Sequence, residues 1–214
     1  GNFSFSFSIL SRMDVERAIM PERVLCTCYE DQPVSQLAKE LVEKLQSLEN
    51  VRVMLGVDAT NLPTYVRNEK FTKVIFMFPH IGGKMKIHKN RQLLRNLATS
   101  CSEILCPVRG ELIVALCAGQ GGTPEEKVRR AEADSWQIVK MMSYGRLSLV
   151  RCSIFDPADA FETYRSFGYR SLDKGFHSEN SIVHAFRLRQ MPPKTPIRRF
   201  DQVSEKILME RRVK

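Results

Sequence analysis

The sequence lacks the features that mark several large classes of protein. A Gly-x-Gly-x-x-Gly motif is absent, which argues against an NAD(P)-dependent oxidoreductase. No apolar run is long enough to span a membrane, and the first residues do not have the pattern of a signal peptide. No Cys-x-x-Cys pair and no Cys/His cluster with zinc spacing is present. We therefore expect the cysteines to be small buried residues of a protein from a reducing compartment: Cys26, Cys28, Cys101, Cys106, Cys117 and Cys152.

The composition indicates one globular domain with a basic tail. Of the 214 residues, 43% are hydrophobic and 27% are charged, which is typical of a soluble domain with a sizeable core. Most of the net charge of +9 lies from Arg187 onward, where nine basic and three acidic residues contribute +6. Prolines interrupt residues 190–196. The sequence therefore predicts one domain over residues 1–189 and a proline-rich basic linker or tail over residues 190–214.

Apolar segments with strand character alternate with segments of helical spacing. The alternation of phenylalanine and serine over residues 3–8 would suit a strand, but the residues that follow favour a loop leading into a helix. Further helices are expected over residues 34–48, from His88 to Leu105, and around Trp136, where Ser135 would cap the helix and Gly145 would end it. The predicted strands are residues 24–29, 51–55, 73–78, 110–117, 147–154 and 181–188. This order predicts an α/β fold with a mostly parallel sheet and an antiparallel final pair.

The strand over residues 73–78 leads into the segment with the strongest functional signal. Its apolar residues predict burial on both faces of the sheet, and Pro79 ends it because proline cannot donate to a strand ladder. His80 follows, and Gly82 and Gly83 allow the backbone to approach a ligand closely. Ligands of open α/β sheets bind beyond the carboxyl ends of the strands. We interpret this segment as one wall of an active site, with an ordinary strand-to-turn exit as the alternative.

Acidic residues follow two other predicted strands. Glu30 and Asp31 come after the strand of residues 24–29, and Asp58 follows that of residues 51–55. An acidic residue after the first of these strands can accept hydrogen bonds from ribose hydroxyls. An acidic residue after the second strand can reach an adenine amino group. Acids also cap helices and face solvent at such places. Together they indicate an adenosine-shaped pocket along one edge of the sheet.

Several short motifs carry a resemblance to a known family. They are G-N-F-S-F-S from Gly1, G-V-D-A-T from Gly56, F-P-H-I-G-G-K from Phe78, N-R-Q-L-L from Asn90 and G-Y at Gly168. In this order they resemble the eukaryotic ribosomal-RNA uridine-N(3) methyltransferase-like family, over residues 1–188. The stretch A-L-C-A-G-Q-G-G-T-P from Ala115, with S-W-Q from Ser135, is similar to an animal branch in which an anticodon-binding-like domain follows.

The resemblance implies a Rossmann-like methyltransferase fold that uses S-adenosyl-L-methionine to methylate RNA. The implied partner is rRNA, or tRNA, without a membrane, and the implied location is intracellular: the nucleolus, the nucleus or the cytoplasm. A catalytically inactive RNA-binding module with the same fold is the alternative. Family members begin with a hydrophobic strand and a G-E-G turn, whereas this sequence starts at the last glycine of that turn. Without this central strand two inner sheet edges would be unpaired, and we expect a fragment of a longer chain rather than an inactive variant.

The resemblance also assigns roles to individual residues. Those that would bind the cofactor are Gly1, Asn2 and Phe3 at its methionine end, Glu30 or Asp31 at its ribose, and Asp58 with Ala59 at its adenine. Pro79 and His80 would face the methyl group and the base, with His80 as the general base or, alternatively, as a histidine that shapes the loop through a backbone hydrogen bond. Phosphate contacts are expected from Lys84, Lys89 and Arg91, which could equally be a solvated helix start. Tyr169 and Phe176 could stack on a flipped base, whereas Trp136 better suits the core; no metal is implied.

Overall fold

The computed structural model describes residues 2–15, 21–82, 86–155, 176 and 178–190 of the chain. The helices in this part are α1 (Ser4–Val15), α2 (Gln36–Gln46), α3 (Pro63–Val66), α4 (Ile87–Ile104) and α5 (Ile138–Ser143), with short 3-10 helices η1 (Ala59–Asn61) and η2 (Glu132–Asp134). The strands are β1 (Val24–Thr27), β2 (Val51–Met54), β3 (Lys73–Met77), β4 (Glu111–Leu116), β5 (Leu147–Phe155) and β6 (Ser181–Leu188). The predicted tail lies outside the described residues beyond Gln190, so its boundary stays a prediction.

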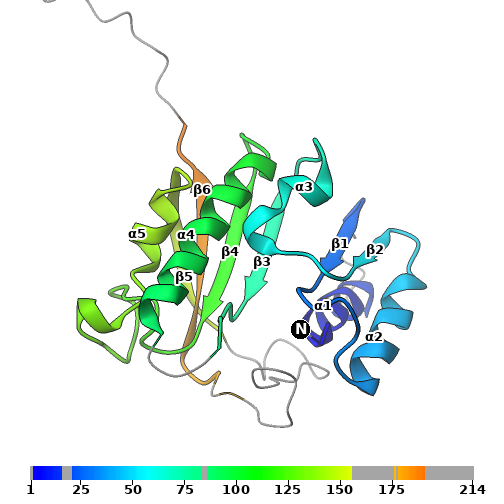
Figure 1. The fold of residues 1–214 in the computed structure, drawn as a ribbon, viewed down its shortest axis with the longest axis horizontal. Coiled ribbons are helices and arrows are strands. Elements are labelled where there is room, and N and C mark those ends of the chain that lie inside the picture. Colours follow the sequence, from blue (N-terminus) through cyan, green and yellow to red (C-terminus); the bar gives the residue numbers. More distant parts are fainter. Residues whose placement is uncertain (1, 16–20, 83–85, 156–175, 177, 191–214) are drawn as a thin grey trace, which may run out of the picture.

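The strands form two sheets (Figure 1). In the smaller sheet β1 and β2 are parallel. In the larger one, of order β3-β4-β6-β5, β3 and β4 are parallel and β6 runs antiparallel to both of its neighbours. This confirms the predicted α/β fold with an antiparallel final strand. Among the described strands, β1 pairs only with β2 and β3 only with β4, which agrees with the two unpaired inner edges expected from the sequence.

The prediction that β3 is buried on both faces was wrong. Val74 and Phe76 pack against the main core, whereas the side chain of Ile75, on the opposite face, is 39% exposed. The apolar sequence of a strand does not reveal its position in the sheet. In the described structure β3 lies at the end of the larger sheet, and a strand in that position has fewer neighbours to cover it.

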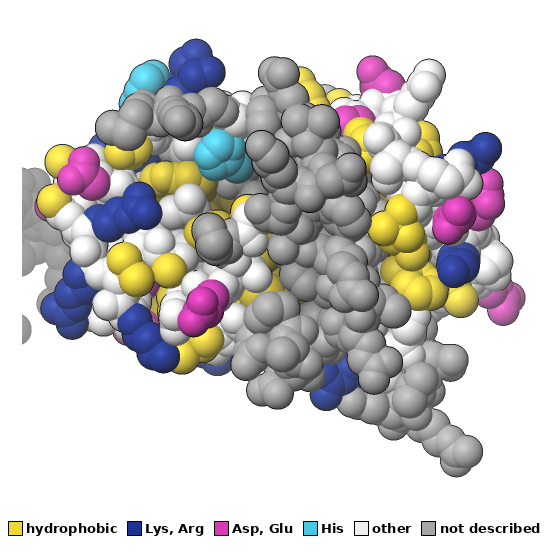
Figure 2. Space-filling model, turned by 90° about the horizontal axis from the view of Figure 1, so that it is seen from below, with side chains coloured by type: hydrophobic (Ala, Val, Ile, Leu, Met, Phe, Trp, Pro, Cys, Tyr) yellow, Lys and Arg dark blue, Asp and Glu magenta, His cyan; other side chains and the backbone are white. Residues whose placement is uncertain are grey.

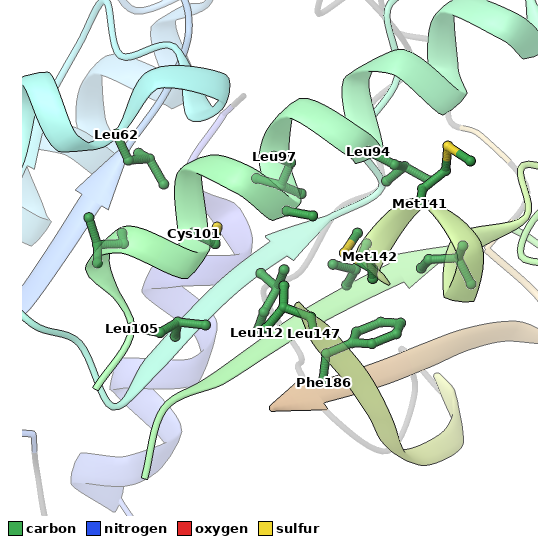
Figure 3. Close-up of a cluster of buried hydrophobic side chains, with 14 of the residues drawn as sticks. Leu62, Leu94, Leu97, Cys101, Leu105, Leu112, Met141, Met142, Leu147 and Phe186 are labelled. Carbon is green, nitrogen blue, oxygen red and sulfur yellow. The ribbon is translucent and has the colours of Figure 1, made fainter. Parts of the chain in front are cut away.

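Helices α4 and α5 cover one face of the larger sheet and enclose the main core (Figure 3). The apolar residues of α4 recur at steps of three and four, which places Leu94, Leu97 and Cys101 on the face toward the sheet. From the sheet, Leu112 and Phe186 meet them, and all five are fully buried. Burying one such leucine or phenylalanine side chain stabilises the fold by about 1.5–3 kcal/mol.

A second core joins α1, α2 and β1. Its buried side chains are Phe3, Leu10, Cys26, Cys28, Leu41, Val42 and Leu45. Helix α1 confirms the predicted loop-into-helix at the start of the chain. All six cysteines are free, and Cys26, Cys28 and Cys101 are buried as expected, whereas the other three are only partly buried. No described helix is both long enough and apolar enough to cross a membrane.

Helix α5 begins later than predicted. Ser135 does not cap it; its hydroxyl donates instead to the carbonyl of Glu132, at 3.2 Å. Gln137 then adopts a left-handed backbone conformation (φ 51°), so regular helix starts only at Ile138. The Ile138 N–H donates to the carbonyl of Gly121 at 2.9 Å. The tertiary contact with the loop after β4 therefore decides where the helix begins, and a local capping pattern cannot show this.

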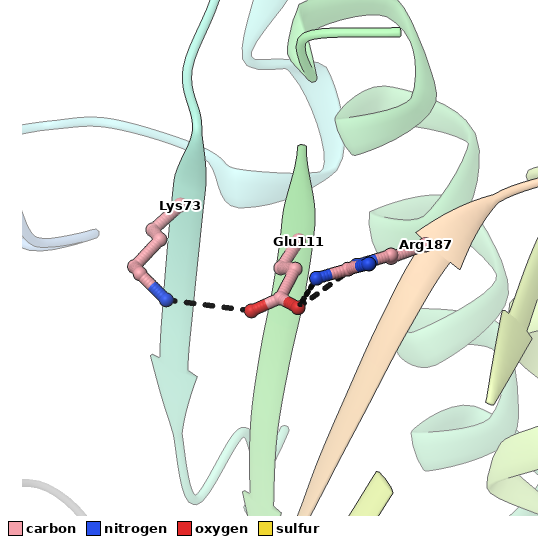
Figure 4. Close-up of polar contacts among 3 residues, drawn as sticks. All are labelled: Lys73, Glu111 and Arg187. Carbon is pink, nitrogen blue, oxygen red and sulfur yellow. Dashed lines mark hydrogen bonds and ion pairs between the residues drawn. The ribbon is translucent and has the colours of Figure 1, made fainter. Parts of the chain in front are cut away.

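A buried carboxylate links β3, β4 and β6 of the larger sheet at the end remote from His80 (Figure 4). Glu111 of β4 accepts two hydrogen bonds from the Arg187 guanidinium of β6, at 2.9 and 2.6 Å. Its other oxygen lies 3.3 Å from the ammonium of Lys73 on β3. The hydrogen bonds from Arg187 lower the pKa of the Glu111 carboxyl. The three charged side chains can meet because β3, β4 and β6 are neighbours in the sheet and each supplies one of them.

His184 is a fully buried titratable residue on β6. Its Nδ1 lies 3.4 Å from the carbonyl oxygen of Val114, and its Nε2 lies 3.4 Å from the hydroxyl of Thr123. The ring stacks on Phe186 with centroids 6.5 Å apart. Burial lowers the pKa of His184 to about 4, so the ring is neutral at physiological pH.

We predict that His184 makes the fold sensitive to acid. Its folded-state pKa of about 4 lies below the ordinary value of 6.5, so between these pH values the unfolded chain binds a proton that the folded chain does not. The contribution of His184 to the free energy of unfolding should therefore fall by about 3 kcal/mol as the pH is lowered through this range. Urea unfolding at several pH values measures this. His184→Asn should flatten the curve between pH 6.5 and pH 4, whereas the exposed control His88→Gln should leave its shape unchanged. An unchanged slope in His184→Asn would contradict the assignment.

Candidate functional site

The loops after β1 and β2 bring the predicted acidic residues together. The backbone ladder continues beyond the two strands, because the Val57 N–H donates to the Cys28 carbonyl at 2.8 Å and the Gly56 N–H donates to the Glu30 carbonyl at 2.9 Å. Asp58 follows on the same loop. The structure therefore brings the two acid-bearing loops side by side at the carboxyl end of this sheet.

Gly56 is required by the close approach of Asp31. Its φ is +67°, and a Cβ at this position would lie 2.5 Å from Oδ1 of Asp31. The Asp31 carboxylate thus lies directly over the Gly56 backbone. Asp58 caps η1, because its Oδ1 accepts hydrogen bonds from the Thr60 N–H at 2.8 Å and the Thr60 hydroxyl at 2.7 Å. Its Oδ2 accepts none within the described structure. Ala59 is partly buried against the main core.

The amino-terminal residues contribute one core side chain and one buried polar atom that lacks a hydrogen-bond partner in the described structure. Gly1 lies outside the described residues. Oδ1 of Asn2 accepts from the Ser4 N–H at 3.2 Å, but its Nδ2 is buried with no hydrogen-bond partner in the part of the chain that is described. Phe3 is only 6% exposed and packs in the second core, so its main contact is with the protein. A buried amide donor without a partner is costly, and a ligand acceptor would satisfy it.

The exit from β3 is a strained turn held by an aromatic cluster. Phe78 has a left-handed backbone (φ 52°), which is uncommon for a bulky residue. Its N–H donates to the Ala115 carbonyl of β4 at 3.0 Å. Its ring contacts Phe155 at 5.4 Å and Phe176 at 4.7 Å between centroids. This cluster turns the chain so that the buried Pro79 and then His80 follow at the sheet edge.

His80 forms the backbone hydrogen bond of a loop-shaping histidine. Its Nδ1 accepts from the Gly82 N–H at 2.7 Å, and its ring lies 5.8 Å from that of Trp136. Partial burial lowers the pKa of His80 from its ordinary value of 6.5, so the ring is neutral at pH 7. With Nδ1 acting as an acceptor, the proton of the neutral ring lies on Nε2, which is then a donor. The loop-shaping role agrees with the alternative left open by the sequence, and the role as a general base stays a prediction.

The glycine loop after β4 forms the next wall of this edge. Glu126 is 4% exposed and accepts the Gly121 N–H at 2.7 Å, and burial raises the pKa of its carboxyl. A Cβ on Gly121 would meet both Glu126 Oε1 at 2.5 Å and His184 Nε2 at 2.8 Å. Trp136 is 4% exposed, as expected of a core residue, and its backbone N–H donates to the Gln120 carbonyl. Glu126 and His184 were not predicted from the sequence, where the run of glycines after β4 was the only signal.

The structure gives Arg91 a structural role that the sequence did not predict. Its guanidinium donates to the backbone carbonyls of Glu132, Ala133 and Ser135, at 2.5–3.0 Å. These hydrogen bonds use Nε and Nη2 of Arg91, and the phosphate contact of this residue stays a prediction. Lys89, two residues before Arg91, is exposed as expected. The predicted RNA-binding residues Lys84 and Tyr169 lie outside the described residues.

The His80 loop after β3 and the glycine loop after β4 lie at the same edge of the molecule. The carboxyl ends of β3 and β4 point to the lower side of Figure 1, and Figure 2 views the molecule from that side, where apolar side chains are interspersed with charged ones and with histidine. Within the described residues, no group of three or more His, Cys, Asp or Glu side chains could hold a metal ion. The chemistry that this edge offers is therefore that of acceptors for hydroxyl and amino groups, one neutral imidazole and an apolar wall.

Comparison with known proteins identifies related sequences. The family model of the rRNA (uridine-N3-)-methyltransferase BMT5-like proteins matches residues 1–168. The ferredoxin-fold anticodon-binding domain-containing protein 1 of Homo sapiens is 37% identical over 198 residues, which cover 90% of this chain and 30% of the human protein. Its homolog in Mus musculus is 35% identical over 190 residues, which cover 87% and 29% of the two chains. The chain thus spans about a third of the length of these curated relatives.

Solved structures of low sequence identity are also similar to the chain. An S-adenosylmethionine-dependent methyltransferase from Clostridium acetobutylicum has a TM-score of 0.44 and 13% identity, and the match covers 88% of this chain and 92% of that one. Fibrillarin from Aeropyrum pernix, with bound S-adenosyl-L-methionine, has a TM-score of 0.45 and 13% identity, covering 82% and 60%.

We predict that Arg91 stabilises the loop of residues 132–135. Arg91→Ala removes charge-assisted hydrogen bonds from three carbonyls, so the free energy of unfolding should fall by about 1.5–3 kcal/mol. Urea unfolding measures this, and hydrogen exchange should show faster opening of residues 132–138. Lys89→Ala on the same helix is the matched control and should change stability by less than about 0.5 kcal/mol. If Arg91→Ala weakened RNA binding while stability stayed unchanged, the structural role would be refuted.

Proposed function

The chain belongs to the rRNA (uridine-N3-)-methyltransferase BMT5-like family, and we propose that it transfers a methyl group from S-adenosyl-L-methionine to N3 of a uridine in RNA, with rRNA as the substrate class. The observation that carries this proposal is that two acid-bearing loops follow β1 and β2 of the smaller sheet, while His80 and an aromatic wall follow β3 of the larger sheet. An RNA-binding module without methyl transfer is the alternative. Binding of S-adenosylmethionine, measured by calorimetry, separates the two functions.

The described residues fit the cofactor. The buried Nδ2 of Asn2, which has no partner in the described structure, would donate to an acceptor at the methionine end of the ligand. Asp31, which lies over Gly56, would accept from ribose hydroxyls, and Oδ2 of Asp58 would accept from the adenine amino group. When bound, S-adenosylmethionine supplies a methyl group on a positively charged sulfur, which no side chain of the protein provides.

Methylation of uridine at N3 requires the loss of the N3 proton. As this proton leaves to solvent, negative charge develops on the neighbouring carbonyl oxygens of the uracil ring. A neutral His80 with its proton on Nε2 would donate a hydrogen bond to one of these oxygens and stabilise the charge. The Gly82 N–H bound to Nδ1 would keep the imidazole in this tautomer. This donor role replaces the need for His80 to accept the proton itself.

The apolar wall would orient the base and limit the access of water. Phe78, Phe155 and Phe176 form one ring cluster at the end of β3, and Trp136 supports the ring of His80. The wall would limit water on its own side only, because His80 is itself exposed. It also favours alignment of N3 with the methyl carbon, which the displacement requires.

The relatives suggest a broader setting for this activity. Their names refer to a ferredoxin-fold anticodon-binding domain, and this chain spans about a third of their length. A partner domain of that kind would tether the enzyme to RNA, with tRNA as a second substrate class. A location in the nucleolus, the nucleus or the cytoplasm, where these RNAs are processed, belongs to the same proposal.

We predict that Asp58→Asn weakens S-adenosylmethionine binding while the fold stays intact. Asparagine retains one oxygen, which can still cap η1 through Thr60, but it places an amide NH2 where the adenine amino group needs an acceptor. Calorimetry should show a loss of about 1–3 kcal/mol, or roughly 5- to 150-fold in the dissociation constant. The melting temperature is the control for the cap and should not change. Unchanged affinity would remove Asp58 from the adenine site.

We predict that His80 acts as a hydrogen-bond donor. His80→Gln keeps an amide donor of similar reach, so single-turnover methylation should fall by less than about tenfold, whereas His80→Ala should lose about 10²-fold. The wild-type rate falls at lower pH because uridine keeps its N3 proton. Between pH 8 and the ordinary histidine pKa of 6.5, there should be no additional fall from protonation of His80. If His80→Gln were as slow as His80→Ala and both regained activity at high pH, His80 would be the general base instead.

A further inference from the structure

Helices α4 and α5 expose several basic side chains and one acidic side chain, that of Glu103 at the end of α4. Residues 86–102 and 138–146 contain no aspartate or glutamate. Lys89 and Arg95 of α4 and Lys140 of α5 are exposed, and none of them forms an ion pair within the described structure. No acidic side chain among the described residues pairs with these cations, so an anionic partner could neutralise them.

Contact between Arg95 and Tyr144 joins α4 to the end of α5 at the surface. The guanidinium carbon of Arg95 lies 4.1 Å from the centroid of the Tyr144 ring, directly after α5, and Tyr144 is 49% exposed. Lys140 lies one helical turn before Tyr144, so both project from the same side of α5. On α4, Lys89 lies in the first turn and Arg95 near the middle, and both side chains are exposed. We define Lys89, Arg95, Lys140 and Tyr144 as the α4–α5 basic surface.

This surface begins at the candidate site. Helix α4 starts at Ile87, five residues after Gly82, whose N–H holds His80. Arg91 of the same helix holds the loop that precedes Trp136, and the Trp136 ring lies against His80. A polymer whose target base lies at His80 would therefore have its next residues within reach of α4.

We propose that the α4–α5 basic surface binds the phosphate backbone of single-stranded RNA on one side of the target uridine. This inference rests on the proposed function and names the path of its substrate. Three unpaired cations suit phosphates, since each neutralised phosphate releases counterions. The half-exposed Tyr144 ring within the cationic group suits unpaired bases, which stack on aromatic side chains. A base-paired duplex would not offer its bases to the ring.

The test compares two triple variants with the same change in net charge. Lys89→Gln/Arg95→Gln/Lys140→Gln removes the cations of the surface, and Lys39→Gln/Arg67→Gln/Arg109→Gln removes three exposed cations elsewhere. Affinity for fluorescent single-stranded poly(U) is measured by anisotropy at several salt concentrations. The surface variant should bind about tenfold more weakly, and its slope of log K against log salt should be lower by about two units. The control variant should stay close to the wild type.

Additional measurements keep the inference distinct from its alternatives. Tyr144→Ala should weaken poly(U) binding without changing the salt slope, because it removes stacking and no charge. Equal losses in both triple variants, or no loss in the surface variant, would overturn the proposal. So would a surface variant that loses binding to phosphatidylserine vesicles but not to poly(U). S-adenosylmethionine binding by the same proteins should be unchanged, and a wild type that binds poly(U) but no cofactor would refute the proposed function while the surface stands.

Discussion

The parallel pairing of β3 with β4 is the interaction on which the candidate site depends. The two strands pair in register from Lys73 with Glu111 to Met77 with Ala115, and the Phe78 N–H extends the ladder by one step to the Ala115 carbonyl. Parallel strands end at the same edge of a sheet, so this register brings the His80 loop and the glycine loop together. It also requires a crossover between the strands, which α4 provides.

Buried polar contacts then fix the two loops against each other. Glu126 holds the glycine loop from within, and Arg91 holds the loop that leads to Trp136. Trp136 in turn lies against His80, whose own ring is fixed by Gly82. Glu126 in particular is buried and would be costly to bury without its partner, so the glycine loop has few alternative arrangements. A fixed imidazole with a defined tautomer is a consequence of this network.

The sequence predicted the features that depend on local pattern. The order of strands and helices, the antiparallel β6 and the core position of Trp136 follow from hydrophobic periodicity and from turn residues. The prediction also placed Asp58 and His80 correctly at strand ends, because proline and glycine mark those ends. The family motifs added the expectation that an inner strand edge on each sheet lacks a partner.

The features that it missed depend on contacts between distant segments. Arg91 contacts carbonyls more than 40 residues away, and no spacing in the sequence distinguishes it from the exposed Lys89. The late start of α5 follows from the Ile138 hydrogen bond to the glycine loop, and the exposure of Ile75 follows from the place of β3 in its sheet. A left-handed Phe78 could not be predicted either, since a bulky residue rarely adopts that conformation and does so here within an aromatic cluster.

The central claim is that this sheet edge brings a methyl donor and a uracil base together. Single-turnover reaction of the protein with S-adenosylmethionine carrying a heavy-isotope methyl group and with unmodified rRNA tests it most directly. Mass spectrometry of the digested RNA should then show labelled 3-methyluridine. RNA that is bound by the protein but carries no labelled 3-methyluridine would contradict the account and favour a binding module.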